Sequence, residues 1–258
     1  MAGGIINDLL VEHSFRLFPV DSEHSAIWQC LAGESKHQIK RIILTGSGGP
    51  FRTKTKDEFN QITKEQALQH PNWKMGNKIT IDSATMMNKG LEVIEAFWLF
   101  GVKSHQIDIV VHPESIIHSM VEFVDGSVKA QLGAPEMKIP IQYALTYPNH
   151  SPSNWENLDL TNIGKLHFAK PDLVKFPCIR LAYEALEKGG TSPIVLNVAN
   201  DEVVAAFLNG HISFIQIPNL IEEALSKHEW MDSPNLDTIS HLSNWTSNYI
   251  QEQITTFA

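Results

Sequence analysis

Residues 82–94 read DSATMMNKGLEVI, and their spacing predicts an amphipathic helix. In such a helix Asn88, Lys89 and Glu92 share one face, because side chains three and four residues apart lie one above the other. The apolar residues share another face and continue in register: Met87, Leu91, Ile94 and Trp98. A carboxamide, an ammonium and a carboxylate beside a buried stripe indicate either the wall of a binding cleft or a solvated face.

The chain has 258 residues, of which 43% are hydrophobic, and a formal net charge of -9. These values predict a globular protein with one large or two modest domains. The absence of a Lys/Arg cluster argues against a nucleic-acid or anionic-membrane partner, because both need a basic face. No apolar run reaches the roughly 18 residues of a membrane span, and no signal-like N-terminus is seen. Two distant cysteines, Cys30 and Cys178, fit reduced thiols and predict a cytoplasmic protein.

Short β-rich runs alternate with helical patterns in the first half of the chain. This alternation predicts an α+β fold, with a mixed α/β domain over residues 1–146. The expected strands cover residues 15–19, 42–44, 79–81, 107–111, 119–124 and 127–132. The last two flank Asp125 and Gly126, which is a strong signal for an antiparallel hairpin.

The composition changes after residue 146. Residues 147–172 are rich in Pro, Asn and Ser and have little periodicity, which is typical of a linker. The remaining segment, residues 173–258, is expected to form a C-terminal helical bundle. Helical spacing recurs in it over residues 178–188, 194–208, 217–227 and 236–254.

Asp21 and Glu23 are the first candidate site residues. At a strand end, two residues with this spacing point to the same side of the strand. Two such carboxylates suit a hard divalent cation, Mg²⁺ or Mn²⁺, for which Glu92 is the expected third ligand. The alternative is that Asp21 caps a following helix, with Glu23 and His24 in its first turn. The residues alone leave both interpretations open.

Two loops have the composition of ligand-binding loops. Residues 46–49 read GSGG after an apolar strand, so that backbone N–H groups and the Ser47 hydroxyl can approach a phosphate. The run matches no standard nucleotide motif, and an ordinary tight turn explains it equally well. In residues 70–78, Trp73 lies between a proline and a glycine, which suits either a lid over a substrate or a surface turn.

The segment HPESIIH contributes two histidines, His112 and His118. A separation of six residues is not that of a helical zinc pair, so a zinc site is not expected here. One of the two is a candidate for contact with a substrate.

Seven stretches of this chain match one enzyme family in order and in wording. They read PVDSEHSAI, LTGSGGPF, HPNWKMGNKI, DSATMMNKGLE, HPESIIHSMVEF, DGSVKAQLG and LNVANDEVVAAFL. Together they resemble the 1-deoxy-D-xylulose 5-phosphate reductoisomerases, and the resemblance spans nearly the whole chain. It implies isomerisation of deoxyxylulose phosphate, then reduction by NADPH to 2-C-methyl-D-erythritol 4-phosphate in non-mevalonate isoprenoid biosynthesis. It also implies a homodimer of bacterial or plastid-like origin.

The resemblance assigns roles to individual residues of this chain. It implies that one Mg²⁺ or Mn²⁺ is held by Asp21, Glu23 and Glu92. The implied catalytic residues are Glu23, Lys89, Glu92 and His118. The implied substrate contacts are Ser22, Ser47, His70, Ser83, Asn88, Lys89 and Glu92. Trp73 and Met75 match a loop that closes over the substrate, and Met137 and Gly76 match positions near the cofactor.

The start of the chain departs from the family pattern. Family members carry an N-terminal Rossmann-type domain for NADPH, whereas this chain opens with MAGGII. Residues 1–20 are too short for a dinucleotide fold, which needs at least ~30 residues, so we expect a truncated catalytic portion that does not reduce substrate alone. Two alternatives stay open. One is a metal-dependent sugar-phosphate isomerase or lyase without redox chemistry, and the other is a dimerising binding fragment that pairs through the hairpin at Asp125.

Overall fold

The structure is a computed structural model that describes residues 1–155 and 157–256. The chain divides into two compact units, which are interleaved in the sequence. The helical unit comprises Met1–Asp8, Gly49–Ile94 and Asp172–Ala258, and the sheet unit comprises Leu9–Gly48 and Glu95–Pro171. Two helices, α1 (Gly3–Glu12) and α5 (Met87–Phe100), run from one unit into the other. The division into residues 1–146, 147–172 and 173–258 stays a prediction.

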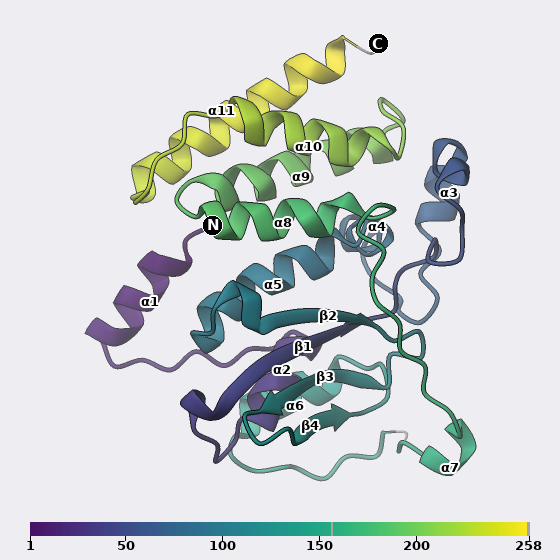
Figure 1. The fold of residues 1–258 in the computed structure, drawn as a ribbon, viewed down its shortest axis with the longest axis vertical. Coiled ribbons are helices and arrows are strands. Elements are labelled where there is room, and N and C mark those ends of the chain that lie inside the picture. Colours follow the sequence, from purple (N-terminus) through teal and green to yellow (C-terminus); the bar gives the residue numbers. More distant parts are fainter. Residues whose placement is uncertain (156, 257–258) are drawn as a thin grey trace. The chain divides into compact units, whose positions relative to one another are not determined.

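The sheet unit contains a four-stranded mixed sheet in the order β2-β1-β3-β4 (Figure 1). β1 (Ile39–Gly46) lies parallel to β2 (Ile107–Val111) and antiparallel to β3 (Ile117–Phe123). β4 (Val128–Leu132) completes the antiparallel hairpin with β3, as the Asp-Gly pair predicts. Asp125 accepts hydrogen bonds from the backbone N–H and hydroxyl of Ser127 at 2.9 and 2.7 Å. The expected strands at 42–44, 107–111, 119–124 and 127–132 are therefore confirmed.

One expected strand in the sheet unit is wrong. Residues 15–19 have no regular structure, and the chain enters α2 (Ser22–Cys30) directly afterwards. α2 packs against β3 and β4 and buries Ala26 and Ile27 completely. The remaining elements of this unit are α6 (Lys138–Thr146), α7 (Leu160–Ile163) and the 3-10 turns η1 (Lys36–Gln38) and η3 (Ser104–Gln106).

The C-terminal part of the helical unit confirms the four expected helices. They are α8 (Pro177–Lys188), α9 (Ser192–Leu208), α10 (Gln216–Lys227) and α11 (Leu236–Thr255). α9 is the central one, because it packs against each of the other three. Its sequence is apolar on most sides, as expected for a helix surrounded by other helices.

The helix expected over residues 82–94 is interrupted, and the strand expected over 79–81 is wrong. Residues 79–81 belong to α4 (Asn77–Ala84). The polar residues Asn88, Lys89 and Glu92 lie on α5. The two helices are separated by Thr85, whose Oγ1 accepts from the Met87 N–H at 3.3 Å, and by Met86 in a left-handed conformation (φ 61°). Period-2 apolar spacing in a short run does not distinguish a strand from one turn of a buried helix.

Two shorter elements complete the helical unit, η2 (Asp57–Gln61) and α3 (Lys64–Ala67). Gly90 allows α5 to approach α8 closely, because a Cβ at this position would lie 2.6 Å from the Cβ of Ala182. Both cysteines are buried free thiols, and burial raises the pKa of Cys30 to about 11 and that of Cys178 to about 12. Among the described helices, none has the length and apolar character to cross a lipid bilayer.

Gly49 makes a close backbone contact inside the helical unit. It has a left-handed backbone (φ 68°), and a Cβ there would lie 2.6 Å from the carbonyl oxygen of Ser83. We predict that Gly49→Ala destabilises the chain by about 1–3 kcal/mol more than Gly101→Ala, because overpacking adds to the strain of the left-handed conformation. Gly101 is a matched control, since it shares this conformation (φ 65°) with nothing within 4 Å of its Cβ position. Urea unfolding of both variants measures the difference, and equal losses of stability would contradict the prediction.

Candidate active site

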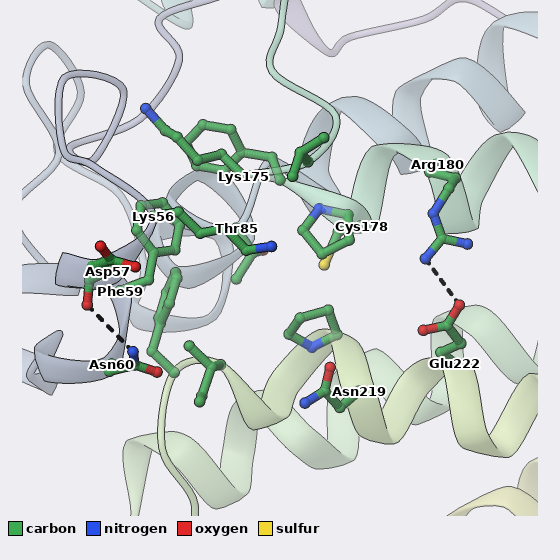
Figure 2. A pocket seen from close by; sticks show the side chains of 16 residues that line it. Lys56, Asp57, Phe59, Asn60, Thr85, Lys175, Cys178, Arg180, Asn219 and Glu222 are labelled. Atoms are coloured by element: carbon green, nitrogen blue, oxygen red, sulfur yellow. Dashed lines mark hydrogen bonds and ion pairs between the residues drawn. The ribbon is translucent and has the colours of Figure 1, made fainter.

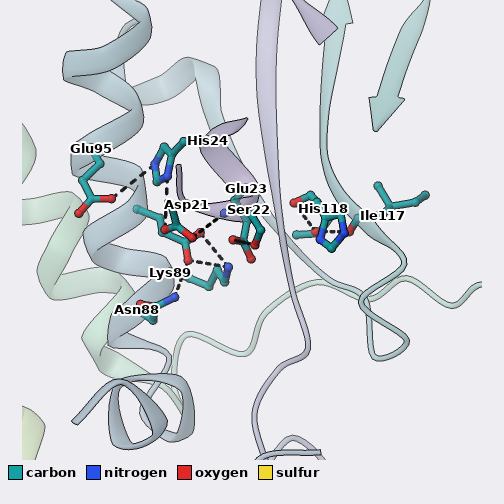
Figure 3. Close-up of polar contacts among 11 residues, drawn as sticks. Asp21, Ser22, Glu23, His24, Asn88, Lys89, Glu95, Ile117 and His118 are labelled. Carbon is teal, nitrogen blue, oxygen red and sulfur yellow. Dashed lines mark hydrogen bonds and ion pairs between the residues drawn. The ribbon is translucent and has the colours of Figure 1, made fainter. Parts of the chain in front are cut away.

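The polar face of α5 is buried rather than solvated. Lys89 donates to both carboxylate oxygens of Glu92 at 2.7 Å, and the Asn88 carboxamide donates to the same carboxylate (Figure 3). Lys89 is 7% exposed and Glu92 1% exposed. Burial of an ion pair carries a desolvation cost that its attraction does not always repay, so a buried pair is weak support for a purely stabilising role. The interpretation of this face as the wall of a binding site is favoured.

Asp21 is the N-cap of α2, as the capping interpretation predicts. Its carboxylate accepts from the Ser22 N–H at 2.7 Å, and the Ser22 hydroxyl donates to Glu23 at 2.6 Å. The strand geometry expected for these residues is wrong, yet the two carboxylates still lie on the first turn of one helix. A carboxylate has about four acceptor positions, so capping and metal ligation are compatible.

The structure adds two residues that the sequence analysis did not place in a site. His24 is 1% exposed and lies between Asp21 and Glu95, with nitrogen-to-oxygen distances of 3.5 and 3.6 Å (Figure 3). One potential ligand atom from each of these three residues lies within 4.8 Å of the others. The available signal was the helical spacing, because Glu95 follows Glu92 by three residues and His24 follows Asp21 by three.

His70 is held as a neutral hydrogen-bond donor. Its Nδ1 accepts from the backbone N–H groups of Asn72 and Trp73 at 3.1 and 2.9 Å, which places the proton of the neutral ring on Nε2. Burial, and secondly the positive charge of Lys89, lowers the pKa of His70 to about 4. His70 therefore lies within electrostatic reach of the α5 face and is uncharged at neutral pH.

Ser83 lies in the last turn of α4, where its backbone meets Gly49. The distance of 2.6 Å from a Cβ built on Gly49 to the Ser83 carbonyl shows how closely the two segments pack. Ser47, which is 8% exposed, precedes Gly49 by only two residues in the chain. The GSGG loop is thus more than a solvated turn, because its last glycine packs against the helix that carries Ser83.

The two histidines of HPESIIH have different environments. His112, at the end of β2, is fully buried, and both ring nitrogens have backbone partners, the His167 carbonyl at 2.9 Å and the Ile116 N–H at 3.1 Å. It is structural. His118 is 7% exposed in β3, and its backbone carbonyl accepts from the Thr45 hydroxyl at 2.7 Å. Because both ring nitrogens of His112 already have backbone partners, a substrate contact by one of these two histidines stays a prediction, with His118 as the candidate.

The segment expected to form a lid is a loop. Residues 71–76 have no helix or strand, and Trp73 and Met75 are each half-buried in it. Gly76 is the N-cap of α4 and ends the loop. Met137 lies in the sheet unit, is 36% exposed and is the N-cap of α6.

A cavity of about 420 Å³ opens in the helical unit beside the start of α8 (Figure 2). Phe59, Phe176 and Phe214 line it, and Phe59 meets the other two rings edge-on at 5.5 and 5.8 Å. On its rim Arg180 is paired with Glu222 at 2.9 Å. None of the residues predicted for the metal or the substrate lines this cavity.

Comparison with known proteins gives one consistent result. Residues 17–100 match the family model described as the 1-deoxy-D-xylulose 5-phosphate reductoisomerase C-terminal domain, and residues 132–249 match the DXP reductoisomerase C-terminal domain. The reductoisomerase of Chloroherpeton thalassium is 57% identical over 98% of this chain and 65% of its own length. Reductoisomerase 2 of Bacillus cereus is 55% identical over 98% of this chain and 67% of its own length.

Solved structures of the same enzyme match the fold. The reductoisomerase of Zymomonas mobilis in complex with NADPH has a TM-score of 0.92 and 43% identity, covering 98% of this chain and 65% of that structure. A DOX-P reductoisomerase in complex with NADPH, fosmidomycin and magnesium has a TM-score of 0.92 and 40% identity, covering 99% and 67%. The chain thus spans about two thirds of the length of its relatives, 65% to 67% in these four comparisons. This chain belongs to the 1-deoxy-D-xylulose 5-phosphate reductoisomerase family.

Proposed function

We propose that this chain forms the metal- and substrate-binding part of an enzyme that converts 1-deoxy-D-xylulose 5-phosphate to 2-C-methyl-D-erythritol 4-phosphate with NADPH. The observation that carries the proposal is the buried group on α5. Lys89, Glu92 and Asn88 are linked there, beside a neutral His70. A buried ammonium, carboxylate and carboxamide within reach of a neutral imidazole suit a phosphorylated sugar and a cation.

Asp21, Glu23 and Glu92 are the proposed ligands of one Mg²⁺ or Mn²⁺. Three carboxylates are the hard oxygen donors that both ions prefer. α5 is unbroken from Met87 to Phe100, so Glu92 lies one turn before Glu95, which lies near Asp21. Related structures are named as magnesium complexes, which supports this ion. When bound, the ion supplies Lewis-acid chemistry, polarising the substrate carbonyl.

The phosphate end of the substrate is proposed to lie between α4 and α5. Neutral donors from Ser47, His70, Ser83 and Asn88, with one cation from Lys89, suit a dianion in an acidic protein. Ser22, Lys89 and Glu92 are proposed to contact the sugar oxygens, and His118 to act beside them. Trp73 and Met75 are proposed to close over the substrate and exclude water, which strengthens each of these contacts.

Met137 and Gly76 are proposed to lie near the nicotinamide of NADPH. Met137 offers a partly exposed apolar side chain, and Gly76 offers a backbone without a side chain at the end of the lid loop. Related structures are named as NADPH complexes, which supports this cofactor for the enzyme.

The metal assignment predicts the effect of removing one carboxylate charge. Glu92→Gln should weaken Mg²⁺ binding at least tenfold, because a neutral carboxamide leaves the buried Lys89 charge unopposed beside the ion. Glu184→Gln is a matched control, since Glu184 is an exposed carboxylate paired with Arg180. Calorimetric titration of Mg²⁺ and then of deoxyxylulose phosphate measures both steps. If Mg²⁺ affinity is the same in the two variants, or if the sugar phosphate binds equally well without metal, the proposal fails.

The lowered pKa of His70 predicts a pH dependence of stability. The pKa of His70 is about 6.5 in the unfolded chain and about 4 in the folded chain. Between these two pH values, His70 binds a proton in the unfolded chain but not in the folded chain. The contribution of His70 therefore lowers the free energy of unfolding as the pH falls from about 6.5 to about 4. His70→Asn removes the titrating group and retains an oxygen acceptor for the two backbone N–H groups. The stability advantage of the unaltered chain over this variant, from urea unfolding, should shrink from pH 7 to pH 5; a constant difference would contradict the prediction.

A homodimer is proposed to form through the edge of the sheet. β4 pairs only with β3 in the described residues, and its first half, from Val128 to Ala130, is exposed. Exposed edge strands pair readily with a second copy, and two-fold symmetry brings equivalent residues together. Val128→Asp should shift sedimentation from dimer to monomer, whereas Val174→Asp, at an exposed valine of the helical unit, should not. A monomeric unaltered chain would refute this proposal.

A further inference from the structure

A buried polar network joins α4 to α9 within the helical unit. The Asn200 carboxamide donates to Asp82 at 2.8 Å, and the Lys78 ammonium lies 2.8 Å from the other oxygen of Asp82. Lys78 also pairs with Asp201 at 2.9 Å. Asn200 is fully buried and Asp82 is 2% exposed, so this carboxylate is bonded from both helices and has almost no access to water.

The network is costly for a purely structural connection. Burial raises the pKa of Asp82, although the charge and hydrogen bond of Lys78 and the hydrogen bond of Asn200 oppose that shift. The side-chain oxygen of Asn200, Oδ1, is buried without a hydrogen-bond partner among the described residues. A hydrophobic contact between two helices would avoid both costs, and partly satisfied buried polar groups are uncommon.

The network attaches α4, which follows the lid loop, to α9 of the helical bundle. α4 begins at the end of the lid loop and carries Ser83, one of the proposed phosphate contacts, immediately after Asp82. α9 is the central helix of the bundle and packs against α8, α10 and α11, so it offers a rigid attachment point. Asn200 and Asp201 belong to LNVANDEVVAAFL, one of the seven stretches that resemble the family, and the resemblance assigns neither residue a role.

We propose that Asn200 is a positioning residue for the phosphate site. Through Asp82 it fixes α4 on the bundle, so that Ser83 and the end of the lid loop are preorganised before substrate binds. This inference rests on the proposed function and extends it to residues that touch neither the substrate nor the metal. Preorganised groups gain affinity because their ordering is not paid for at binding.

The test compares affinities for two ligands in one variant. Asn200→Asp keeps the side-chain size but places a second carboxylate against Asp82. It should weaken calorimetric binding of deoxyxylulose 5-phosphate about tenfold, which corresponds to ~1.4 kcal/mol. Mg²⁺ binding should change less than about twofold, because α5 is not attached through this network. The expected loss of sugar-phosphate affinity is smaller than the losses measured when one partner of a direct charge pair is removed.

A swap and a control distinguish positioning from general loss of stability. Asp82→Asn combined with Asn200→Asp restores one carboxylate and one carboxamide, and should recover most of the lost affinity. Val203→Ala in the same helix removes buried apolar volume without a bond to Asp82. It should lower stability and leave sugar-phosphate binding unchanged. The inference is overturned if Val203→Ala weakens binding as much as Asn200→Asp, or if the swap recovers nothing.

Hydrogen exchange tests the inference without any ligand. In the Asn200→Asp variant, amides of α4 should exchange at least about tenfold faster, while those of α10 stay protected. Unchanged exchange in α4 overturns the inference, whatever the ligands do. Failure of the unaltered chain to bind deoxyxylulose 5-phosphate, with faster exchange in α4 of the variant, would instead refute the proposed function and leave the attachment of α4 to α9 in place.

Discussion

The ion pair between Lys89 and Glu92 is the interaction on which the proposed site depends. Both groups are almost inaccessible to water, and the ammonium reaches both oxygens of the carboxylate at 2.7 Å. Such a pair costs desolvation energy, and one partner without the other costs several kcal/mol more. The proposed ligands would take over the two charges, a cation that of Glu92 and a phosphorylated sugar that of Lys89.

The surrounding fold serves to hold this helix and its neighbours at fixed positions. Gly90 permits close packing of α5 on α8, and the left-handed Gly49 permits the GSGG loop to meet the backbone of Ser83. His70 is oriented by two backbone N–H groups, which fix its tautomer as well as its position. Close packing or backbone hydrogen bonds thus hold proposed site residues in position before any ligand arrives, which is the arrangement that electrostatic preorganisation requires.

The sequence predicted the elements whose pattern is long or reinforced by turn chemistry. The four C-terminal helices and the hairpin at Asp125 are examples, since each combines periodicity with a clear break. Short apolar runs were the failures: residues 79–81 form a helix, and residues 15–19 form no regular element. In both, local spacing is satisfied by more than one conformation, and tertiary packing decides between them.

For the candidate site, sequence reasoning identified the α5 residues because helical periodicity links them within one turn. It did not predict that their face is buried, since burial depends on contacts that are distant in sequence. It also missed His24 and Glu95, whose approach to Asp21 requires α2 and α5 to come together. The connection of Asn200 to Asp82 spans 118 residues, and no local pattern predicts such a contact.

Three carboxylates of this chain are proposed to hold one divalent ion. The most direct measurement is anomalous diffraction from crystals of the chain grown with Mn²⁺ and deoxyxylulose 5-phosphate. We expect one anomalous peak about 2.0–2.4 Å from carboxylate oxygens of Asp21, Glu23 and Glu92, with the sugar phosphate beside it. A peak coordinated by His24 and Glu95 instead, or a bound sugar phosphate with no peak near these carboxylates, would contradict it.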